Sequence, residues 1–528
     1  MASAAAPARG RGEPAIAPAD DVAHLPVENH LLLVIGVMAA TLLQVLDTTI
    51  ANVAIPHMQS TLSATPDTIS WVLTSYIIAS AVAMPITGWL ADRIGSRRLF
   101  IWSVAGFVVA SMLCGMAQNL EEMVMFRALQ GVAGAFIAPL SQAAMLDTTR
   151  PSRQAQIIAL WGMGVMIGPI LGPVLGGWIT QNWSWRWCFY VNVPVGAACL
   201  AIMMAELPSR PIVRRKFDLF GFALIAIGLS CLQLLLDRGN QQDWFNSFEI
   251  WVYGFLVASC VWMAVIHFVT DRDPLFDRHL FANVNFVIAL FFMIVIGMVM
   301  FATMALLPPM LQGLFNYDVV DTGMALMPRG VGVLISMQLS AYAVRKGVDA
   351  RWMVSSGFLI GAYSLYQMSG WSLDVDRFHV ILSGFIQGLG IGLVFIPLQG
   401  MAFATLPPRL RTDGSSLLNL TRNVGSSVGI SIMMTLLARN TETSHSDLAS
   451  HITPTMAEVT DLSTMDRFQQ AGEAVMQLLN AMVTRQAAMV AYIDDFYLMM
   501  WMSLAAVPLV LIMRKSSGAA PRVAPPEH

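Results

Sequence analysis

Four ionisable side chains stand deep inside long apolar runs of this sequence, namely Asp47, Arg127, Arg329 and Arg422. A charge at the centre of a bilayer costs roughly 2.5–3.5 kcal/mol on insertion scales, so residues retained there are functional candidates. With helix 31–55 running outward and helix 121–145 running inward, Asp47 and Arg127 lie about 12 and 9 Å below the same face. An acid and a base at matching depth can neutralise each other, and the acid can also bind a proton.

We predict that Asp47 is the principal proton acceptor and Arg127 its electrostatic partner. Apolar surroundings favour the neutral acid, whereas a nearby arginine favours the carboxylate. The alternative is a static ion pair that only fixes the two helices against each other. Arg329 and Arg422 have no acid in the spans of their own half, so they are candidates for binding backbone carbonyls or anionic substrate groups, or for packing and helix-end roles.

The elements that carry these residues follow from the composition, which is that of an integral membrane protein. Of 528 residues, 56% are hydrophobic and 12% are charged, whereas soluble proteins have about 25% charged residues. This excludes a soluble enzyme, a nucleic-acid-binding protein and a disordered scaffold. Since about 20 apolar residues cross a hydrocarbon core of about 30 Å, we predict an all-α membrane fold with fourteen transmembrane helices, at 31–55, 68–90, 98–117, 121–145, 157–180, 186–206, 217–236, 248–270, 283–310, 322–345, 351–370, 377–400, 412–437 and 490–513.

Lys and Arg residues predict the direction of these helices. They gather in the loops after even-numbered helices, as in 93–98, 150–153, 210–216 and 409–411. Short loops rich in Lys and Arg remain in the cytoplasm, so both termini are expected there.

An internal repeat predicts the domain organisation. A helix with a Gln-Gly pair, a Pro-containing basic loop and a Gly-rich helix follow one another twice, first from Arg127 and again from Gly384. Pseudo-symmetric repeats are typical of secondary transporters, whose substrate site lies between the repeats. The expected parts are a disordered cytoplasmic tail (1–30), an N-terminal six-helix half (31–206), two inserted helices with flanking loops (207–282), a C-terminal six-helix half (283–513) and a cytoplasmic tail (514–528).

The loop 438–489, between the last two predicted helices, is unusually long and is expected on the outer face. It has helical apolar spacing. This pattern fits an amphipathic helix on the membrane surface or a docking surface for a partner outside the membrane.

Five motifs occur in a recognisable order, at 46–56, 88–98, 162–177, 185–194 and 236–245. Together they resemble the major facilitator superfamily, and in particular its fourteen-span drug:proton antiporters of the EmrB/QacA type. The resemblance extends over nearly the whole chain. It implies the two-lobed fold of that superfamily with two inserted helices, and multidrug efflux in exchange for protons by alternating access.

Two motifs suggest moving or gating parts. The 88–98 loop is predicted to act as a cytoplasmic latch, although its arginines could serve only to set topology, and Asp92 can pair with Arg93 or a nearby helix end. In the 162–177 helix, small residues allow close helix approach and prolines bend the helix, which fits a leak-preventing helix or plain tight packing. The motif residues are Gly88, Asp92, Arg93, Gly95, Arg97, Arg98, Gly168, Pro169, Gly172, Pro173 and Gly176.

The substrate cavity is expected between the two halves, lined by aromatic, methionine and glutamine side chains. Aromatic rings bind cations and flat drugs, and methionine adapts to varied shapes. Lipid-facing or packing roles are the alternative for each residue. The candidates are Gln44, Trp71, Tyr76, Gln130, Gln142, Trp161, Met300, Phe301, Met304, Gln312, Phe385 and Gln387.

The sequence contains no Gly-x-x-x-x-Gly-Lys-[Ser/Thr] phosphate loop and no paired haem ligands. We therefore expect no enzyme activity, cofactor or metal, and coupling to an ion gradient instead. The resemblance implies drugs and protons as cargo, the bacterial inner membrane as location, and a periplasmic membrane-fusion adaptor with an outer-membrane channel as partners. A transporter for a specific metabolite or nutrient and a non-transporting receptor remain alternatives.

Overall fold

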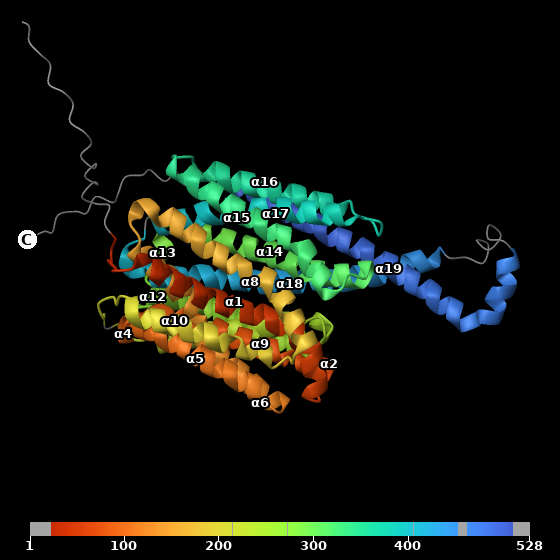
Figure 1. The fold of residues 1–528 in the computed structure, drawn as a ribbon, viewed down its shortest axis with the longest axis horizontal. Coiled ribbons are helices and arrows are strands. Elements are labelled where there is room, and N and C mark those ends of the chain that lie inside the picture. Colours follow the sequence, from red (N-terminus) through yellow and green to blue (C-terminus); the bar gives the residue numbers. More distant parts are fainter. Residues whose placement is uncertain (1–22, 214, 272, 405, 452–461, 511–528) are drawn as a thin grey trace, which may run out of the picture.

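The structure, a computed structural model, describes residues 23–510 apart from 214, 272, 405 and 452–461. The described residues form helices and no strand. Long helical segments run side by side along one axis (Figure 1). They are α1 (His30–Thr61), α3–η1–α4 (Trp71–Ala83, Met84–Ile86, Thr87–Ile94), α5 (Ser96–Met116), α6 (Leu120–Ala135) with α7 (Ile137–Thr148), α8 (Gln154–Asn182), α9 (Trp187–Tyr190) with α10 (Asn192–Glu206), α11 (Leu219–Arg238), α12 (Phe248–Thr270), α14 (Val284–Phe315), α15 (Val319–Arg345), α16 (Ala350–Ser369), α17 (Arg377–Ala404), α18 (Arg411–Ser450) and α19 (Leu462–Leu509).

Twelve of these segments, counted over the described residues, are long and apolar enough to cross a membrane. The predicted all-α membrane fold is therefore confirmed. The remaining two, α16 and α18, fall outside that criterion but pack inside the same bundle. Helix α16 contacts α17 and α19, and α18 contacts α14 and α19. The count of fourteen spans stays a prediction for these two helices.

Capping residues determine where several helices begin and end. The side chain of Asn119 accepts the backbone N–H of Glu122 at the start of α6, and Asp218 accepts that of Gly221 at the start of α11. Such caps satisfy N–H groups that have no partner within the helix. At the end of α14, Asn316 adopts a left-handed conformation that stops the helix. Polar residues thus cut the apolar sequence into separate segments.

The helices form two groups that pack mainly within themselves. In the N-terminal group (30–206), α1 packs against α8 and α10, and α6 packs against α3 and α5. In the C-terminal group (284–510), α14 packs against α18, and α17 packs against α15 and α16. Contacts of α8 with α15 and of α7 with α18 join the groups across a seam. The inserted helix α11 contacts both α3 and α18, so it lies beside this seam.

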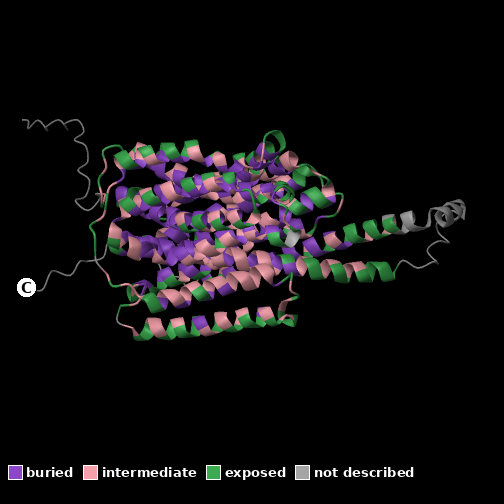
Figure 2. Cartoon of the chain, turned by 90° about the horizontal axis from the view of Figure 1, so that it is seen from below, coloured by how far each residue is buried: buried purple, intermediate pink, exposed green. Residues whose placement is uncertain are grey.

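Helices α18 and α19 extend beyond the rest of the bundle, with exposed side chains on the described part of the extension (Figure 2). The segment predicted as an outer loop at 438–489 is therefore largely helical, because α18 continues to Ser450 and α19 begins at Leu462. Where they leave the bundle, both extensions follow its axis rather than lying flat across its end. Residues 1–22 and 511–528 of the predicted tails lie outside the described residues.

Candidate functional site

A buried ion pair joins α1 to α6. Asp47 and Arg127 are 1% and 0% exposed, and Arg127 Nη1 lies 2.7 Å from Asp47 Oδ2. Gln130 Nε2 and Asn192 Nδ2 both donate to Asp47 Oδ1, at 2.8 and 2.7 Å. The carboxylate thus accepts three hydrogen bonds from α6 and α10, and the sequence-predicted pairing of Asp47 with Arg127 is present in the structure.

The same arginine is held in place from two further sides. Arg127 Nε donates to the carbonyl of Val72 on α3 at 3.1 Å. The ring centroid of Tyr76 lies 4.4 Å from Arg127 Cζ, a cation–π distance. Since Tyr76 also lines the central cavity, its ring stands between the ion pair and that cavity.

Asn192 is a hydrogen-bond partner of Asp47 that was not among the candidate residues chosen from the sequence. It lies within the 185–194 motif, which is where a signal could have been found. Asn192 Nδ2 also donates to Ser111 Oγ at 2.9 Å, which ties α10 to α5. Protonation of Asp47 would remove acceptor capacity from one carboxylate oxygen, so the hydrogen bonds that hold α1 to α6 and α10 would weaken together.

Close packing of α8 holds α1 from the opposite side. A Cβ added at Gly168 would meet Val45, one added at Gly172 would overlap Thr49, and one added at Gly176 would lie 3.3 Å from the Cα of Ile50. The small residues of the predicted packing helix therefore face α1 along the turns that surround Asp47. Pro169 and Pro173 lie inside α8, which remains one continuous helix.

A cavity of about 220 Å³ lies at the seam between the two helix groups. Its walls come from α1, α3, η1, α7, α8, α11, α14 and α18. Three of the predicted cavity residues line it: Gln44, Tyr76 and Phe301. Asp47 and Arg127 do not line it, because Asp47 points from α1 toward α6 and α10.

The other predicted cavity residues lie elsewhere. Gln130 binds the ion pair. Gln142 accepts from Ser415 and donates to Gln399 across the seam, both at 2.5 Å, and Trp161 is fully buried and donates to Ser141 at 2.8 Å. Met300 and Gln387 line a separate small cavity within the C-terminal group. Trp71, Met304 and Phe385 are half-buried and Gln312 is exposed, all outside the central cavity.

Arg329 and Arg422 differ in their surroundings. Arg329 Nη2 donates to the carbonyl of Met300 at 3.1 Å, which is one of the two partners expected for it. Arg422 is 7% exposed and lines the central cavity. Its Nε and Nη1 atoms are buried and have no hydrogen-bond partner within the described part of the chain.

The basic end of the bundle, where the loops 93–98, 150–153, 209–216 and 409–411 meet, is closed by ion pairs. One expectation was that Asp92 forms an ion pair with Arg93, and the structure does not show this pair. Asp92 pairs instead with Arg215, whose Nη2 lies 2.8 Å from Asp92 Oδ2. Nη1 of the same arginine lies 3.2 Å from Oδ2 of Asp413 on α18. Arg93 stacks instead over Trp89. These ion pairs therefore join the N-terminal group, the linker after α10 and the C-terminal group.

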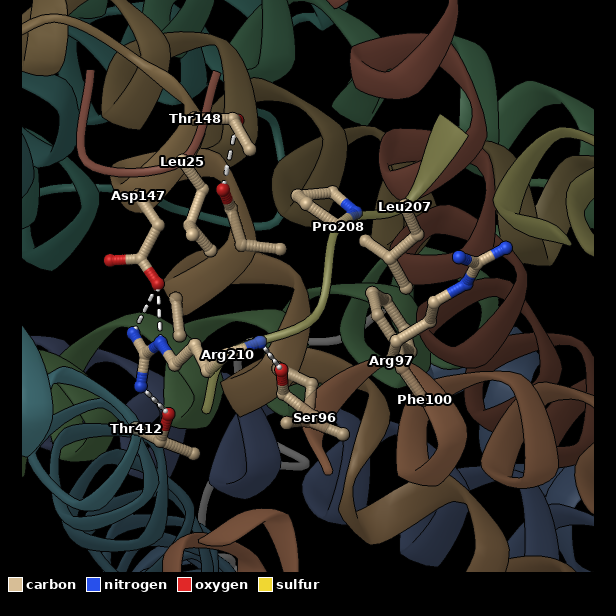
Figure 3. A pocket seen from close by; sticks show the side chains of 13 residues that line it. Leu25, Ser96, Arg97, Phe100, Asp147, Thr148, Leu207, Pro208, Arg210 and Thr412 are labelled. Carbon is tan, nitrogen blue, oxygen red and sulfur yellow. Dashed lines mark hydrogen bonds and ion pairs between the residues drawn. The ribbon is translucent and has the colours of Figure 1, made fainter. Parts of the chain in front are cut away.

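A second ion-pair cluster lies beside the first. Arg210 contacts Asp147 at 2.5 Å and donates to Thr412 Oγ1 at 2.6 Å (Figure 3). Arg411 also reaches Asp147, at 3.1 Å. None of these partners was assigned from the sequence, because ion pairs between residues more than 60 positions apart have no local signature.

Two glycines of the 88–98 loop allow the close packing at this end of the bundle. A Cβ added at Gly88 would overlap Asp413 Oδ1, so only glycine lets α4 approach α18 this closely. Gly95 has φ 93°, a left-handed conformation that favours glycine and turns the chain from α4 into α5. Arg97 Nη2 donates to the carbonyl of Met204 at 2.5 Å, and Arg98 is exposed.

Two further acids, one buried and one half-buried, were not assigned from the sequence. Asp495 of α19 is 1% exposed, and its Oδ2 has no hydrogen-bond partner among the described residues. Asp237, at the end of α11, accepts a hydrogen bond from Thr74 of α3 at 2.5 Å. Both lie near predicted helix ends, so they were not counted among the deep charges.

A helical bundle with a buried ion pair, a central cavity at a seam and an ion-paired end is the architecture of a membrane transporter. The family model of the Major Facilitator Superfamily matches residues 37–430. The chain is 36% identical over 428 residues to "Multidrug export protein EmrB" of Haemophilus influenzae, covering 80% of this chain and 84% of that protein. It is 34% identical to "Fatty acid resistance protein FarB" of Neisseria gonorrhoeae, covering 90% and 94%.

Solved structures agree on the fold. The human organic anion transporter MFSD10 matches with a TM-score of 0.57 at 13% identity, covering 90% of this chain and 99% of that chain. A bacterial homologue of the lysosomal transporter Spinster, in an inward-facing conformation, matches with a TM-score of 0.55 at 16% identity, covering 92% and 99%. The chain therefore belongs to the Major Facilitator Superfamily and, within it, to the EmrB/QacA type.

Proposed function

We propose that this transporter exports hydrophobic and amphipathic toxic compounds across the bacterial inner membrane in exchange for protons. The observation that carries the proposal is the Asp47 carboxylate, which is buried and accepts hydrogen bonds from Arg127, Gln130 and Asn192 next to a cavity at the seam. The multidrug export relatives support the class of cargo. The basic end then faces the cytoplasm, with both termini on that side.

Proton binding and cavity shape are coupled through α1 in this proposal. Gln44 and Thr48 of α1 line the cavity, while Asp47 lies on an adjacent face of the same helix, toward α6 and α10. When Asp47 is protonated, α1 is held less strongly by α6 and α10, and its cavity-lining turn can shift. Drug bound in the cavity favours one position of α1, and therefore one protonation state of Asp47.

Alternating access also requires the basic end to open. The division into an N-terminal half (31–206), two inserted helices (207–282) and a C-terminal half (283–513) is retained as part of this proposal. Opening would break the contacts of Asp413 and Thr412 with Arg215 and Arg210. Arg215 and Arg210 are partly exposed, whereas Asp413 and Thr412 are buried, so opening has to hydrate these buried side chains.

An experiment on purified protein tests the coupling. In proteoliposomes, an imposed pH gradient of one unit supplies about 1.36 kcal/mol, enough for roughly tenfold accumulation of a drug when one proton is exchanged. We expect accumulation of a fluorescent amphipathic drug to follow the gradient and to disappear when nigericin collapses it. Accumulation that is independent of pH on both sides would refute proton coupling, and substrate uptake by intact cells would instead favour a nutrient transporter.

We further propose that the projecting parts of α18 and α19 dock a periplasmic adaptor, which would connect the exporter to an outer-membrane channel. These extensions leave the bundle at the end opposite the basic loops (Figure 1). Deleting about 445–485 should abolish co-purification with the adaptor and drug resistance of whole cells. Drug accumulation in single-membrane proteoliposomes should persist, which controls for folding. Adaptor co-purification that survives the deletion would contradict the docking role.

A further inference from the structure

The residues that line the central cavity include one charged side chain, that of Arg422 on α18. Acidic side chains are absent from the lining. Asp47, the buried acid on α1, faces α6 and α10 and is already neutralised by Arg127 at 2.7 Å. The cavity therefore has a net positive charge in the described structure.

The guanidinium of Arg422 lacks the partners that the other two intramembrane arginines have. Arg127 donates to Asp47, Gln130 and the carbonyl of Val72, and Arg329 donates to the carbonyl of Met300. For Arg422, Nε and Nη1 are buried and unpartnered among the described residues. A buried charge without a partner is costly, so its retention indicates that something else satisfies it.

We propose that Arg422 is the anchor of an anion-binding subsite, and that the cavity takes amphipathic organic anions with a carboxylate head and an apolar tail. A guanidinium presents parallel N–H groups that match a carboxylate in a bidentate arrangement. The proposal deepens the proposed export function, because it names a substrate class for the same cavity.

The distribution of side chains around the cavity fits such a molecule. Near Arg422 on α18 lie the polar side chains of Asn423, Ser426 and Ser427. Three of the four lining residues of α11 are apolar (Leu229, Leu232 and Leu236, beside Gln233), and Phe301 of α14 adds an aromatic ring. The head of the ligand thus lies against α18, and its tail lies along the inserted helix α11.

Binding of a matched pair of probes tests the proposal without any gradient. Decanoate and decyltrimethylammonium share an alkyl chain and differ in the sign of the head. Equilibrium dialysis with the purified full chain should show that decanoate binds. Arg422→Gln should lower the affinity for decanoate by about ten- to hundredfold, the range for a hydrogen bond to a charged group. Decyltrimethylammonium binding should not weaken, and Arg422→Lys should recover part of the decanoate affinity.

A second variant keeps the test decisive if Arg422→Gln does not fold. Ser426→Asp places a carboxylate one helical turn from Arg422, where it can occupy the guanidinium. It should exclude decanoate, while Ser426→Asn measures the purely steric effect of the change. Decanoate affinity that is equal in Ser426→Asp and Ser426→Asn, or equal losses for both probes in Arg422→Gln, would overturn the anion subsite. Since no proton movement is measured, loss of coupling in a transport assay leaves this result unaffected.

Discussion

Asp47→Asn is expected to abolish drug accumulation driven by a pH gradient in proteoliposomes, while facilitated movement of drug down its own gradient persists. Asparagine resembles aspartate in size but carries no titratable proton, so the exchange loses its second substrate. The loss should therefore reach the assay background, and it should be equally complete at each pH tested. The measurement is drug accumulation against an imposed gradient, with drug equilibration in its absence as the reference.

Folding must be separated from coupling in this experiment. Removing Asp47 leaves Arg127 as a buried unpaired charge, which typically costs about 3–5 kcal/mol. The double variant Asp47→Asn with Arg127→Gln removes both charges and should restore stability without restoring accumulation. Asp47→Glu keeps a titratable group and should retain partial accumulation. Wild-type accumulation by a folded Asp47→Asn protein would show that the ion pair is only structural.

Gly88→Ala is expected to open the basic end of the bundle and to reduce export strongly. The new Cβ would occupy the position of Asp413 Oδ1, so the Asp413 side chain has to leave Arg215. Overpacking of this kind costs about 1–3 kcal/mol, equivalent to roughly five- to 150-fold in the equilibrium between closed and open forms. Alanine is also the better helix former, so α4 itself should not be weakened.

Distances between spin labels can measure this opening. Arg98 and Arg409 are exposed on the two helix groups at the basic end, and the five native cysteines are buried and free. Labels at Arg98→Cys and Arg409→Cys should report a longer distance in Gly88→Ala than in the parent. Gly400→Ala is the matched control, since a Cβ at Gly400 meets no atom within 4 Å. An unchanged distance distribution with full export would contradict the latch.

The pairing of Asp47 with Arg127 could be predicted because depth along a helix follows from counting residues, and charges in a bilayer need partners. The number of hydrogen-bond partners of Asp47 could not be predicted from the sequence. Asn192 reaches the same carboxylate only because α10 packs against α1, and helix rotation about its axis decides which side chains meet. For the same reason, only three of the candidates chosen by residue type line the cavity, namely Gln44, Tyr76 and Phe301. Two others, Trp161 and Gln142, lie in buried, hydrogen-bonded positions.

The ion pairs at the basic end show the limit of local motifs. The 88–98 loop was recognised as a latch candidate from its charges, and Gly88 and Gly95 from their flexibility. The partner of Asp92 was not predictable, because Arg215 lies in the linker after α10 and Asp413 lies in the other helix group. Charges on flexible loops have many possible partners of similar energy until packing brings one of them close.

The amino-acid sequence by itself determined that this chain is a helical membrane protein of a transporter family, since apolar length and spaced motifs act locally along the chain. It also placed one acid and one arginine at the same depth. Only the tertiary structure decided that Asp47 faces α6 and α10, that Arg422 lines the cavity without a hydrogen-bond partner among the described residues, and that α11 lies beside the seam. These facts depend on how helices rotate and pack against one another, and packing is a property of residues that are distant in sequence.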